Sequence, residues 1–277
     1  MKGFRIAGGS VPGTDHTKPG QPGWTNSQDA YTWRQDEDLL VAVICDGCGS
    51  TPHAEVGAKI GAQLVARYLF EALHDNLSPI PDMLQDVRSA VVAELVRLAD
   101  AMTGYFSSSV EQIVLDHFLF TIMGVAMNPE ETAVFSLGDG VYAVNGEVHI
   151  VEPHQGNAPP YIGNLTRKRQ NDRPVSEFIL HKVLPTNAVG SILIGSDGVG
   201  DIIKAEHLGL PGKTEVLGPL EQFWTQDRFV TNPDMIRRRL AVANREWAED
   251  GQIHHGLLHD DTTLVVIRRE SPLIAEK

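Results

Sequence analysis

Four aspartates in this chain of 277 residues lie where a predicted β-strand begins or ends, each next to a glycine or a second aspartate. Carboxylates held close together repel one another and raise each other's pKa, and a divalent cation removes that penalty. Ligand sets made of oxygen, without His or Cys, favour Mg²⁺ or Mn²⁺ over Zn²⁺. We therefore expect a hard-metal site formed by Asp46, Asp139, Asp197 and Asp260, and Asp29 follows the same pattern on a further strand.

Asp46 has the clearest setting of these residues. It follows Leu39–Cys45, an apolar run with the length of a buried strand. A carboxylate at the end of such a strand is costly to desolvate unless a positive charge compensates it. Gly47 suits a tight turn, and Thr51-Pro52 suits the start of a helix. A rigidly held acid can position a metal ion, and two ions about 3.5–4 Å apart can share a water molecule and clamp a phosphate group.

Other interpretations compete for the same stretch. An Asp-Gly pair after a strand is often only a turn. A dinucleotide-binding loop needs a third glycine where Pro52 stands. Cys45 and Cys48 form a C-x-x-C pair that could serve redox chemistry, but no second Cys or His pair follows at zinc-binding spacing. Further along, a polar loop is favoured over another kind of metal site for His254, His255 and His259.

The composition argues against several classes of protein. Lys and Arg number 23 and Asp and Glu number 36, so the formal net charge of −13 argues against nucleic-acid binding. Two cysteines in a chain of this length indicate a reducing compartment. The first residues include no apolar run of signal-peptide length, and the longest apolar stretch, Phe118–Met127, is too short to span a bilayer. We expect a cytoplasmic monomer that contacts no membrane.

Apolar periodicity predicts two successive amphipathic helices that would cover one sheet, one from Pro52 to Tyr68 and one from Met83 to Met102. A third helix is predicted at 233–249. Short alternating or apolar runs in the middle of the chain predict an antiparallel meander. Strands are predicted at 4–7, 31–34, 39–45, 118–127, 132–137, 141–144, 148–151, 191–195 and 264–267.

The chain shows no internal repeat and no obvious linker, so a single domain over residues 1–277 is expected. Residues 153–174 are rich in Pro and Gly and include the basic triplet Arg167–Arg169, which predicts a flap on the substrate side. Residues 204–231 are weakly patterned and are left as an unassigned insertion.

Five short segments carry the aspartates in a fixed order: Gln28-Asp29-Ala30, Asp46-Gly47-Cys48-Gly49-Ser50, Gly138-Asp139, Ser196-Asp197-Gly198-Val199-Gly200-Asp201 and Asp260-Asp261-Thr262-Thr263. Together they resemble the metal-dependent Ser/Thr protein phosphatases, the PPM or type 2C family, of which the chain looks like a divergent bacterial-type member. The set spans nearly the whole chain, so it is far more specific than any single segment. The resemblance implies an α+β fold, a four-layer α-β-β-α sandwich of two antiparallel sheets with metal ions at one end.

The resemblance also implies roles for individual residues. Asp46 would bridge two ions, Mn²⁺ or Mg²⁺, and the backbone carbonyl of Gly47 would bind one of them. Asp197 and Asp260 would hold the other ion, and Asp29 would orient bound water. A hydroxide bridging the ions would attack phosphorus directly, without a phospho-enzyme intermediate. The residues that match a third, weaker metal position of the family are Asp139, Asp197 and Asp201.

The chain departs from the family's pattern at four positions. Trp24 stands where many members carry an Arg that grips the phosphate, and Cys48 stands where a His, a candidate general acid, is often found. Ser27 replaces an Asn, and Gly140 replaces a Ser. These changes weaken the transfer of substrate preference more than the transfer of metal binding.

Substitutes for the missing groups are available in the sequence. His16, Lys18 or Arg34 could contact the phosphate, and the spacing does not select among them. Metal-bound water or His53 could protonate the leaving group, although His53 is favoured as a residue at a helix start.

We therefore expect a metal-dependent phosphatase that acts on phosphoserine and phosphothreonine in protein substrates, with a cognate Ser/Thr kinase as a partner. One alternative is a non-catalytic PPM-like module that binds phosphoproteins or a regulator, and another is an enzyme for a small phosphoester. Retention of Asp46, Asp197 and Asp260 favours an enzyme, because an inactive site has no reason to keep mutually repelling acids.

Overall fold

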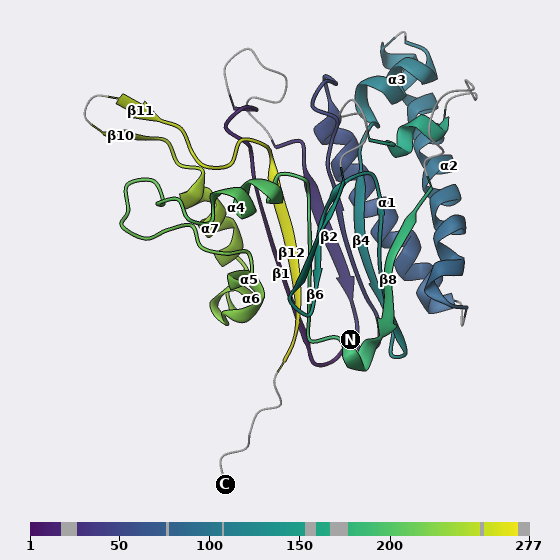
Figure 1. Ribbon diagram of the computed structural model, residues 1–277. Coiled ribbons are helices and arrows are strands. Elements are labelled where there is room, and N and C mark those ends of the chain that lie inside the picture. Colours follow the sequence, from purple (N-terminus) through teal and green to yellow (C-terminus); the bar gives the residue numbers. More distant parts are fainter. Residues whose placement is uncertain are drawn as a thin grey trace.

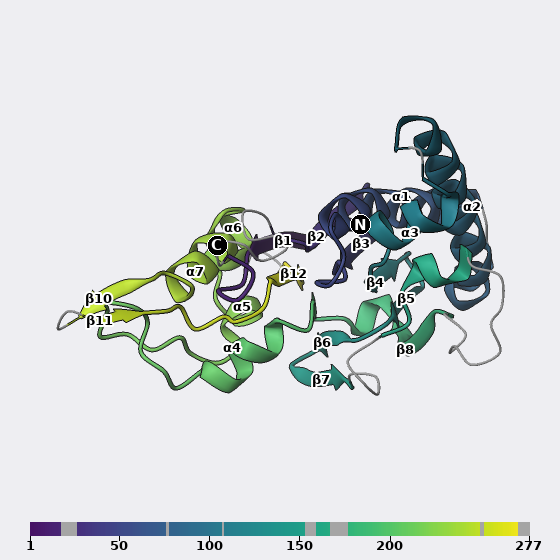
Figure 2. The same cartoon turned by 90° about the horizontal axis from the view of Figure 1, so that it is seen from above.

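The computed structural model describes residues 1–17, 27–75, 78–106, 108–152, 159–166, 177–249 and 252–270. Two five-stranded antiparallel sheets pack face to face, and helices cover both outer faces (Figure 1, Figure 2). One apolar core lies between the sheets, and one lies between each sheet and its helices. The predicted α+β fold, a four-layer α-β-β-α sandwich, is confirmed.

The first sheet has the strand order β2-β3-β4-β5-β8. All six residues of β3 are buried, because Val41, Val43 and Cys45 pack against the helices while the alternate residues pack against the second sheet. Burial on both faces explains the unbroken apolar run in the sequence. The elements of this half are β2 (Ala30–Gln35), β3 (Leu40–Cys45), β4 (Ile122–Met127), β5 (Glu131–Leu137), β8 (Ile179–Pro185), α1 (Ala54–Asp75), α2 (Ile80–Phe106) and α3 (Val110–His117).

The second sheet has the strand order β1-β12-β9-β6-β7, and α7 packs against β1. The approach is close at Gly9, where an added Cβ would lie 2.5 Å from the backbone nitrogen of Arg237. The strands are β1 (Phe4–Val11), β6 (Gly140–Val144), β7 (Glu147–Val151), β9 (Ser191–Gly195) and β12 (Thr262–Arg269). The helices are α4 (Val199–Ala205), α5 (Gln222–Thr225), α6 (Arg228–Thr231) and α7 (Met235–Ala243), and two 3₁₀ turns elsewhere are η2 (Ile162–Thr166) and η3 (Thr186–Ala188).

Strand register brings the aspartate-bearing segments to one end of the two sheets. In the first sheet Ala30 pairs with Cys45, so the start of β2 lies beside the end of β3. In the second sheet Gly195 pairs with both Val141 and Leu264, so the end of β9 lies between the starts of β6 and β12. The five predicted aspartates precede or follow these strand ends and therefore gather at a shared edge.

Three features of the middle of the chain differ from the predictions. No helix was predicted between residues 102 and 118, but Ser109 accepts a hydrogen bond from the backbone of Gln112 and starts α3. The strand predicted from Phe118 begins only at Ile122. The predicted meander is instead two hairpins, because β4 pairs with β5 in the first sheet and β6 pairs with β7 in the second. The Gly138-Asp139 segment carries the chain from one sheet to the other.

The C-terminal half also differs from the predictions. The helix expected at 233–249 ends at Ala243, and Trp247 instead starts a small hairpin, β10 (Trp247–Glu249) with β11 (Gln252–His254). The unassigned insertion at 204–231 contains α5 and α6, whose Phe223 and Phe229 are fully buried in the second core. Helices of four residues are too short to show helical periodicity, which is why the sequence did not predict them. Strand β8 was not predicted, because it is an edge strand that is largely exposed and lacks alternation.

Of the segment expected to form a flap, residues 153–174, the structure describes 159–166, and Arg167–Arg169 lie outside the described residues. Lys18 also lies outside them. No helix among the described residues is both long enough and apolar enough to cross a membrane.

Candidate metal centre

A cavity of about 240 Å³ opens at the shared end of the two sheets. Four of the predicted carboxylates line it: Asp46 after β3, Asp139 between β5 and β6, Asp197 after β9 and Asp260 before β12. The remaining lining residues are His16, Gly47, Cys48, Gly49, Ser50, Thr121, Pro159 and Tyr161. The structure thus brings together acids that lie far apart in the sequence.

The carboxylates strongly perturb one another. Burial, followed by the charges of Asp29 and Asp197, raises the pKa of Asp46 well above its usual value. The side chain of Asp197 is partly open to solvent. Desolvation of its carboxyl group by nearby protein atoms, followed by the charges of Asp260 and Asp139, raises the pKa of Asp197 to about 6. The carboxyl groups of Asp46 and Asp197 are also within hydrogen-bonding reach of each other. Two such groups cannot both carry full charge at neutral pH without a cation or a shared proton.

The donor set fits divalent cations bound through oxygen. Carboxylates predominate, and a side chain at Gly47 is excluded because an added Cβ would lie 2.8 Å from both Ala54 Cβ and the Gln28 carbonyl oxygen. The chain at Gly47 can therefore approach its neighbours closely. Among the described residues, no three His, Cys, Asp or Glu side chains are drawn together tightly enough to enclose one ion. The carboxylates are instead distributed around the wall of one cavity.

Asp29 lies in the protein interior, with 4% of its surface exposed, and does not line the cavity. Its Oδ2 accepts a hydrogen bond of 2.7 Å from the hydroxyl of Ser196, whereas Oδ1 makes no hydrogen bond within the described part of the chain. Burial, and then the charge of Asp261, raises the pKa of Asp29 well above its usual value. The unpaired buried oxygen is suited to accept a hydrogen bond from a water molecule.

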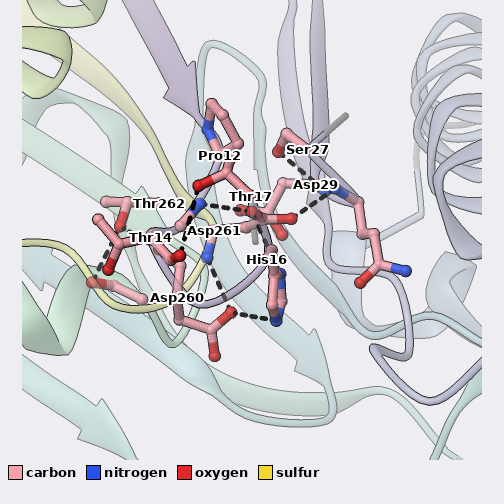
Figure 3. Close-up of polar contacts among 12 residues, drawn as sticks. Pro12, Thr14, His16, Thr17, Ser27, Asp29, Asp260, Asp261 and Thr262 are labelled. Carbon is pink, nitrogen blue, oxygen red and sulfur yellow. Dashed lines mark hydrogen bonds and ion pairs between the residues drawn. The ribbon is translucent and has the colours of Figure 1, made fainter. Parts of the chain in front are cut away.

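Asp261 is a structural anchor that the sequence analysis did not identify (Figure 3). It is 2% exposed, and its carboxylate accepts hydrogen bonds from the backbone nitrogens of Gly13 (2.7 Å) and Gln28 (2.5 Å). It thereby joins the loop after β1 to the segment before β2. Successive residues of an extended segment point in opposite directions, so in an Asp-Asp pair one side chain can face the cavity while the next faces the interior. That alternation is the signal in the sequence that could have revealed it.

His16 lies between the two acids of that pair. Its Nδ1 is 3.3 Å from Oδ1 of Asp261, and its Nε2 is 3.5 Å from Oδ1 of Asp260 (Figure 3). The interaction with Asp261 outweighs burial and raises the pKa of His16 to about 9. At neutral pH His16 is therefore an imidazolium, and it is the basic side chain among the described residues that line the cavity.

Asp201 does not line the cavity. Its Oδ2 accepts hydrogen bonds from the backbone nitrogens of His259 (2.9 Å) and Asp260 (3.3 Å), and its Oδ1 lies 3.2 Å from the ammonium of Lys204. Asp201 thus supports the loop that presents Asp260.

The remaining candidates among the histidines do not line the cavity. His53 precedes the first residue of α1 and stacks on His117, with ring centroids 4.8 Å apart. His254 stacks on Trp247, and His255 contacts Glu246, so the three C-terminal histidines do not converge. The position of His53 agrees with the interpretation as a helix-start residue, whereas His254 lies in strand β11 and only His255 and His259 lie in the loop that follows it.

The family model for protein phosphatase 2C matches residues 12–237 of the chain. Among solved structures, the serine/threonine phosphatase Stp1 from Staphylococcus aureus is similar, with a TM-score of 0.57 and 13% identity over 96% of this chain and 95% of that chain. The Mycobacterium tuberculosis serine/threonine phosphatase PstP/Ppp gives a TM-score of 0.52 and 17% identity over 97% and 99% of the two chains.

A third structure is the catalytic domain of the serine threonine protein phosphatase PstP in complex with two manganese ions, with a TM-score of 0.51 and 16% identity over 97% of this chain and 99% of that chain. At such identities these similarities show a shared fold. No curated protein matches the chain significantly.

Proposed function

The chain belongs to the protein phosphatase 2C family, and on that premise we propose that it is a metal-dependent phosphatase that hydrolyses phosphoserine and phosphothreonine in proteins. The observation that carries the proposal is the convergence of Asp46, Asp139, Asp197 and Asp260 on one cavity. These carboxylates repel one another, and bound divalent cations would relieve that repulsion, so the site would bind such cations favourably.

Two ions, Mn²⁺ or Mg²⁺, would be held by Asp46, the carbonyl of Gly47, Asp197 and Asp260. When bound, such ions supply a lowered pKa for water and neutralise charge on a phosphate group. Asp139 lines the same cavity and would contribute to a third, weaker position together with Asp197. Asp201 would join it only if the backbone of His259 and Asp260 released its carboxylate.

The chain's own residues have distinct roles in this proposal. Asp29 would orient a water molecule through Oδ1, while the hydrogen bond from Ser196 holds the other oxygen in place. His16 would help to orient Asp260 and present positive charge at the cavity wall. Its side chain is already engaged by two carboxylates, so it supplies less to a phosphate than a free cation would.

A phosphoprotein substrate is favoured by the position of the cavity, which is lined by residues at the strand ends rather than by the apolar core. The flap segment, with its basic triplet, would contact the peptide on either side of the phosphorylated residue. A cognate Ser/Thr kinase would supply such substrates. The alternative of a non-catalytic binding module is less favoured, because binding alone does not require several mutually repelling carboxylates in one cavity.

The test is hydrolysis of an aryl phosphate and of a phosphothreonine peptide, with and without Mn²⁺, by the wild type and by Asp46→Ala. Asp86→Ala is the matched control, because Asp86 is an exposed acid on α2. Turnover that depends on Mn²⁺, is lost in Asp46→Ala and is kept in Asp86→Ala supports the proposal. Binding of Mn²⁺ detected by calorimetry without any turnover would favour the binding module, and absence of Mn²⁺ binding would contradict both.

A further inference from the structure

Tyr161 is an aromatic residue in the wall of the carboxylate cavity, and it comes from the described part of the flap segment. Its neighbours fix its position. Ile162 is fully buried and donates a backbone hydrogen bond to the carbonyl of Phe120, and Gly163 packs so closely that an added Cβ would lie 2.3 Å from the carbonyl oxygen of Phe118. The backbone around Tyr161 is therefore docked on residues 118–120.

Residues 118–121 also form backbone hydrogen bonds to the chain around Asp46. The backbone nitrogen of Thr121 donates to the carbonyl oxygen of Asp46, and the backbone nitrogen of Cys48 donates to the carbonyl oxygen of Leu119. Tyr161 and the predicted metal ligand Asp46 are thus attached to one rigid stretch of backbone, 118–121. A group held in this way keeps its distance from the reacting centre, which is what positioning a substrate requires.

Tyr161 shares the cavity wall with Cys48 and interacts electrostatically with its thiol. The Sγ of Cys48 lies 3.2 Å from the hydroxyl of Ser50. Sulfur is a weak acceptor, so the hydroxyl can exchange this contact for a charged oxygen at little cost. Burial, followed by the contact with Cys48, raises the pKa of Tyr161, so the group keeps its proton and remains a donor.

The described lining of the cavity offers few cationic side chains that could bind a phosphate group. No Lys or Arg of the described residues lines it, and the imidazole of His16 is already held by Asp260 and Asp261. A phosphate group entering between the carboxylates needs hydrogen bonds to its oxygens in addition to any bound cations.

From these observations we infer that the Tyr161 hydroxyl binds an oxygen of the substrate's phosphate group and acts as a neutral donor in a cavity whose described lining includes no Lys or Arg. The O–H bond stays intact, and the residue contributes a hydrogen bond to binding and to the transition state. The inference rests on the proposed function for its substrate, but the binding of phosphate by Tyr161 can be measured without turnover.

The experiment titrates inorganic phosphate into the Mn²⁺-loaded wild type, Tyr161→Phe and Tyr105→Phe, with calorimetric detection. Tyr105 is 88% exposed on α2 and is the matched control for loss of a hydroxyl. Removing one hydrogen bond to a charged group is expected to weaken phosphate binding by about 10- to 100-fold in Tyr161→Phe. Affinity for Mn²⁺ and thermal stability should stay at wild-type values, because the ring remains in place. The KM for an aryl phosphate should rise in parallel.

Unchanged phosphate affinity in Tyr161→Phe would overturn the inference, since the hydroxyl would then contribute nothing to phosphate binding. An equal loss of Mn²⁺ and phosphate affinity would also overturn it, because Tyr161 would then act through the metal ligands. If the wild type binds phosphate but shows no Mn²⁺-dependent hydrolysis, the proposed function fails while the phosphate titrations still decide the role of Tyr161. A wild type that binds no phosphate overturns the inference directly.

Discussion

The carboxyl groups of Asp46 and Asp197 meet within hydrogen-bonding reach, although Asp46 follows β3 of the first sheet and Asp197 follows β9 of the second. The contact joins the two sheets at their shared end. Two acids in such contact are compatible with folding when a proton or a cation lies between them. The stability of the protein is therefore expected to depend on both pH and metal.

Metal-free protein should lose stability as the pH rises. The pKa of Asp197 is raised to about 6 in the folded state, above its unfolded value, so the folded protein binds the proton more tightly. The stabilisation is fully present below the unfolded pKa and is lost as the pH rises through about 6. We expect the melting temperature in EDTA to fall between pH 5 and pH 7.5, and Mn²⁺ to restore it at the higher pH.

Asp197→Asn separates this effect from the general repulsion within a chain of net charge −13. In EDTA at pH 7.5 the variant should melt at a higher temperature than the wild type, and its melting temperature should vary less with pH. A wild-type melting temperature that stays constant or rises between pH 5 and pH 7.5 would contradict the prediction.

Asp261 should matter for stability more than for chemistry. Asp261→Ala leaves the buried backbone nitrogens of Gly13 and Gln28 without their acceptor and releases His16. We expect a loss of about 3 kcal/mol in the free energy of unfolding, because two buried donors become unpaired. Urea denaturation of Asp261→Ala beside Asp86→Ala measures the difference. Equal stability of the two variants would show that the anchor contributes nothing.

The parts of the site that could be predicted from the sequence have local signals. Asp46 follows a run that is apolar because β3 is buried on both faces, and Asp197 follows the similarly buried β9. A strand that is buried on both faces has an unbroken apolar sequence, which can be recognised without knowledge of the fold. The family resemblance then supplied an order for the remaining aspartates.

The parts that could not be predicted depend on contacts between distant segments. Tyr161 lies in a segment rich in Pro and Gly without periodicity, and its place at the cavity results from the close approach of Gly163 to Phe118. Asp201 matched a metal-binding position by motif, but the structure shows its carboxylate engaged by the loop before Asp260. Such pairings are decided by tertiary packing, which a motif does not encode.

Two glycines in helices should respond to alanine in opposite directions. At Gly57 in α1 an added Cβ would lie 1.8 Å from the carbonyl oxygen of His117, so Gly57→Ala must displace α1 from the end of α3. At Gly104 in α2 an added Cβ meets no atom within 4 Å. We expect Gly57→Ala to destabilise the protein by about 3 kcal/mol and Gly104→Ala to stabilise it by about 0.5–1 kcal/mol.

Urea denaturation of both variants tests this pair, and the sign of the difference is the informative result. If Gly57→Ala were as stable as the wild type, the result would contradict the close packing of Gly57 against the carbonyl group of His117 at the end of α3. A destabilised Gly104→Ala would instead show that the end of α2 is not a free helical surface.

Cys48 should be dispensable for turnover. Its thiol lies at the cavity, in contact with Tyr161 and 3.2 Å from the hydroxyl of Ser50, and Cys45, the other member of the C-x-x-C pair, is fully buried. In Cys48→Ser a hydroxyl takes the place of the thiol, and this neutral hydroxyl is still a weaker acceptor for Tyr161 than a charged phosphate oxygen. We expect kcat and KM for an aryl phosphate within about threefold of wild type, since no ion or nucleophile is lost. Loss of turnover in Cys48→Ser, with calorimetric Mn²⁺ binding intact, would show that the thiol takes part in the reaction.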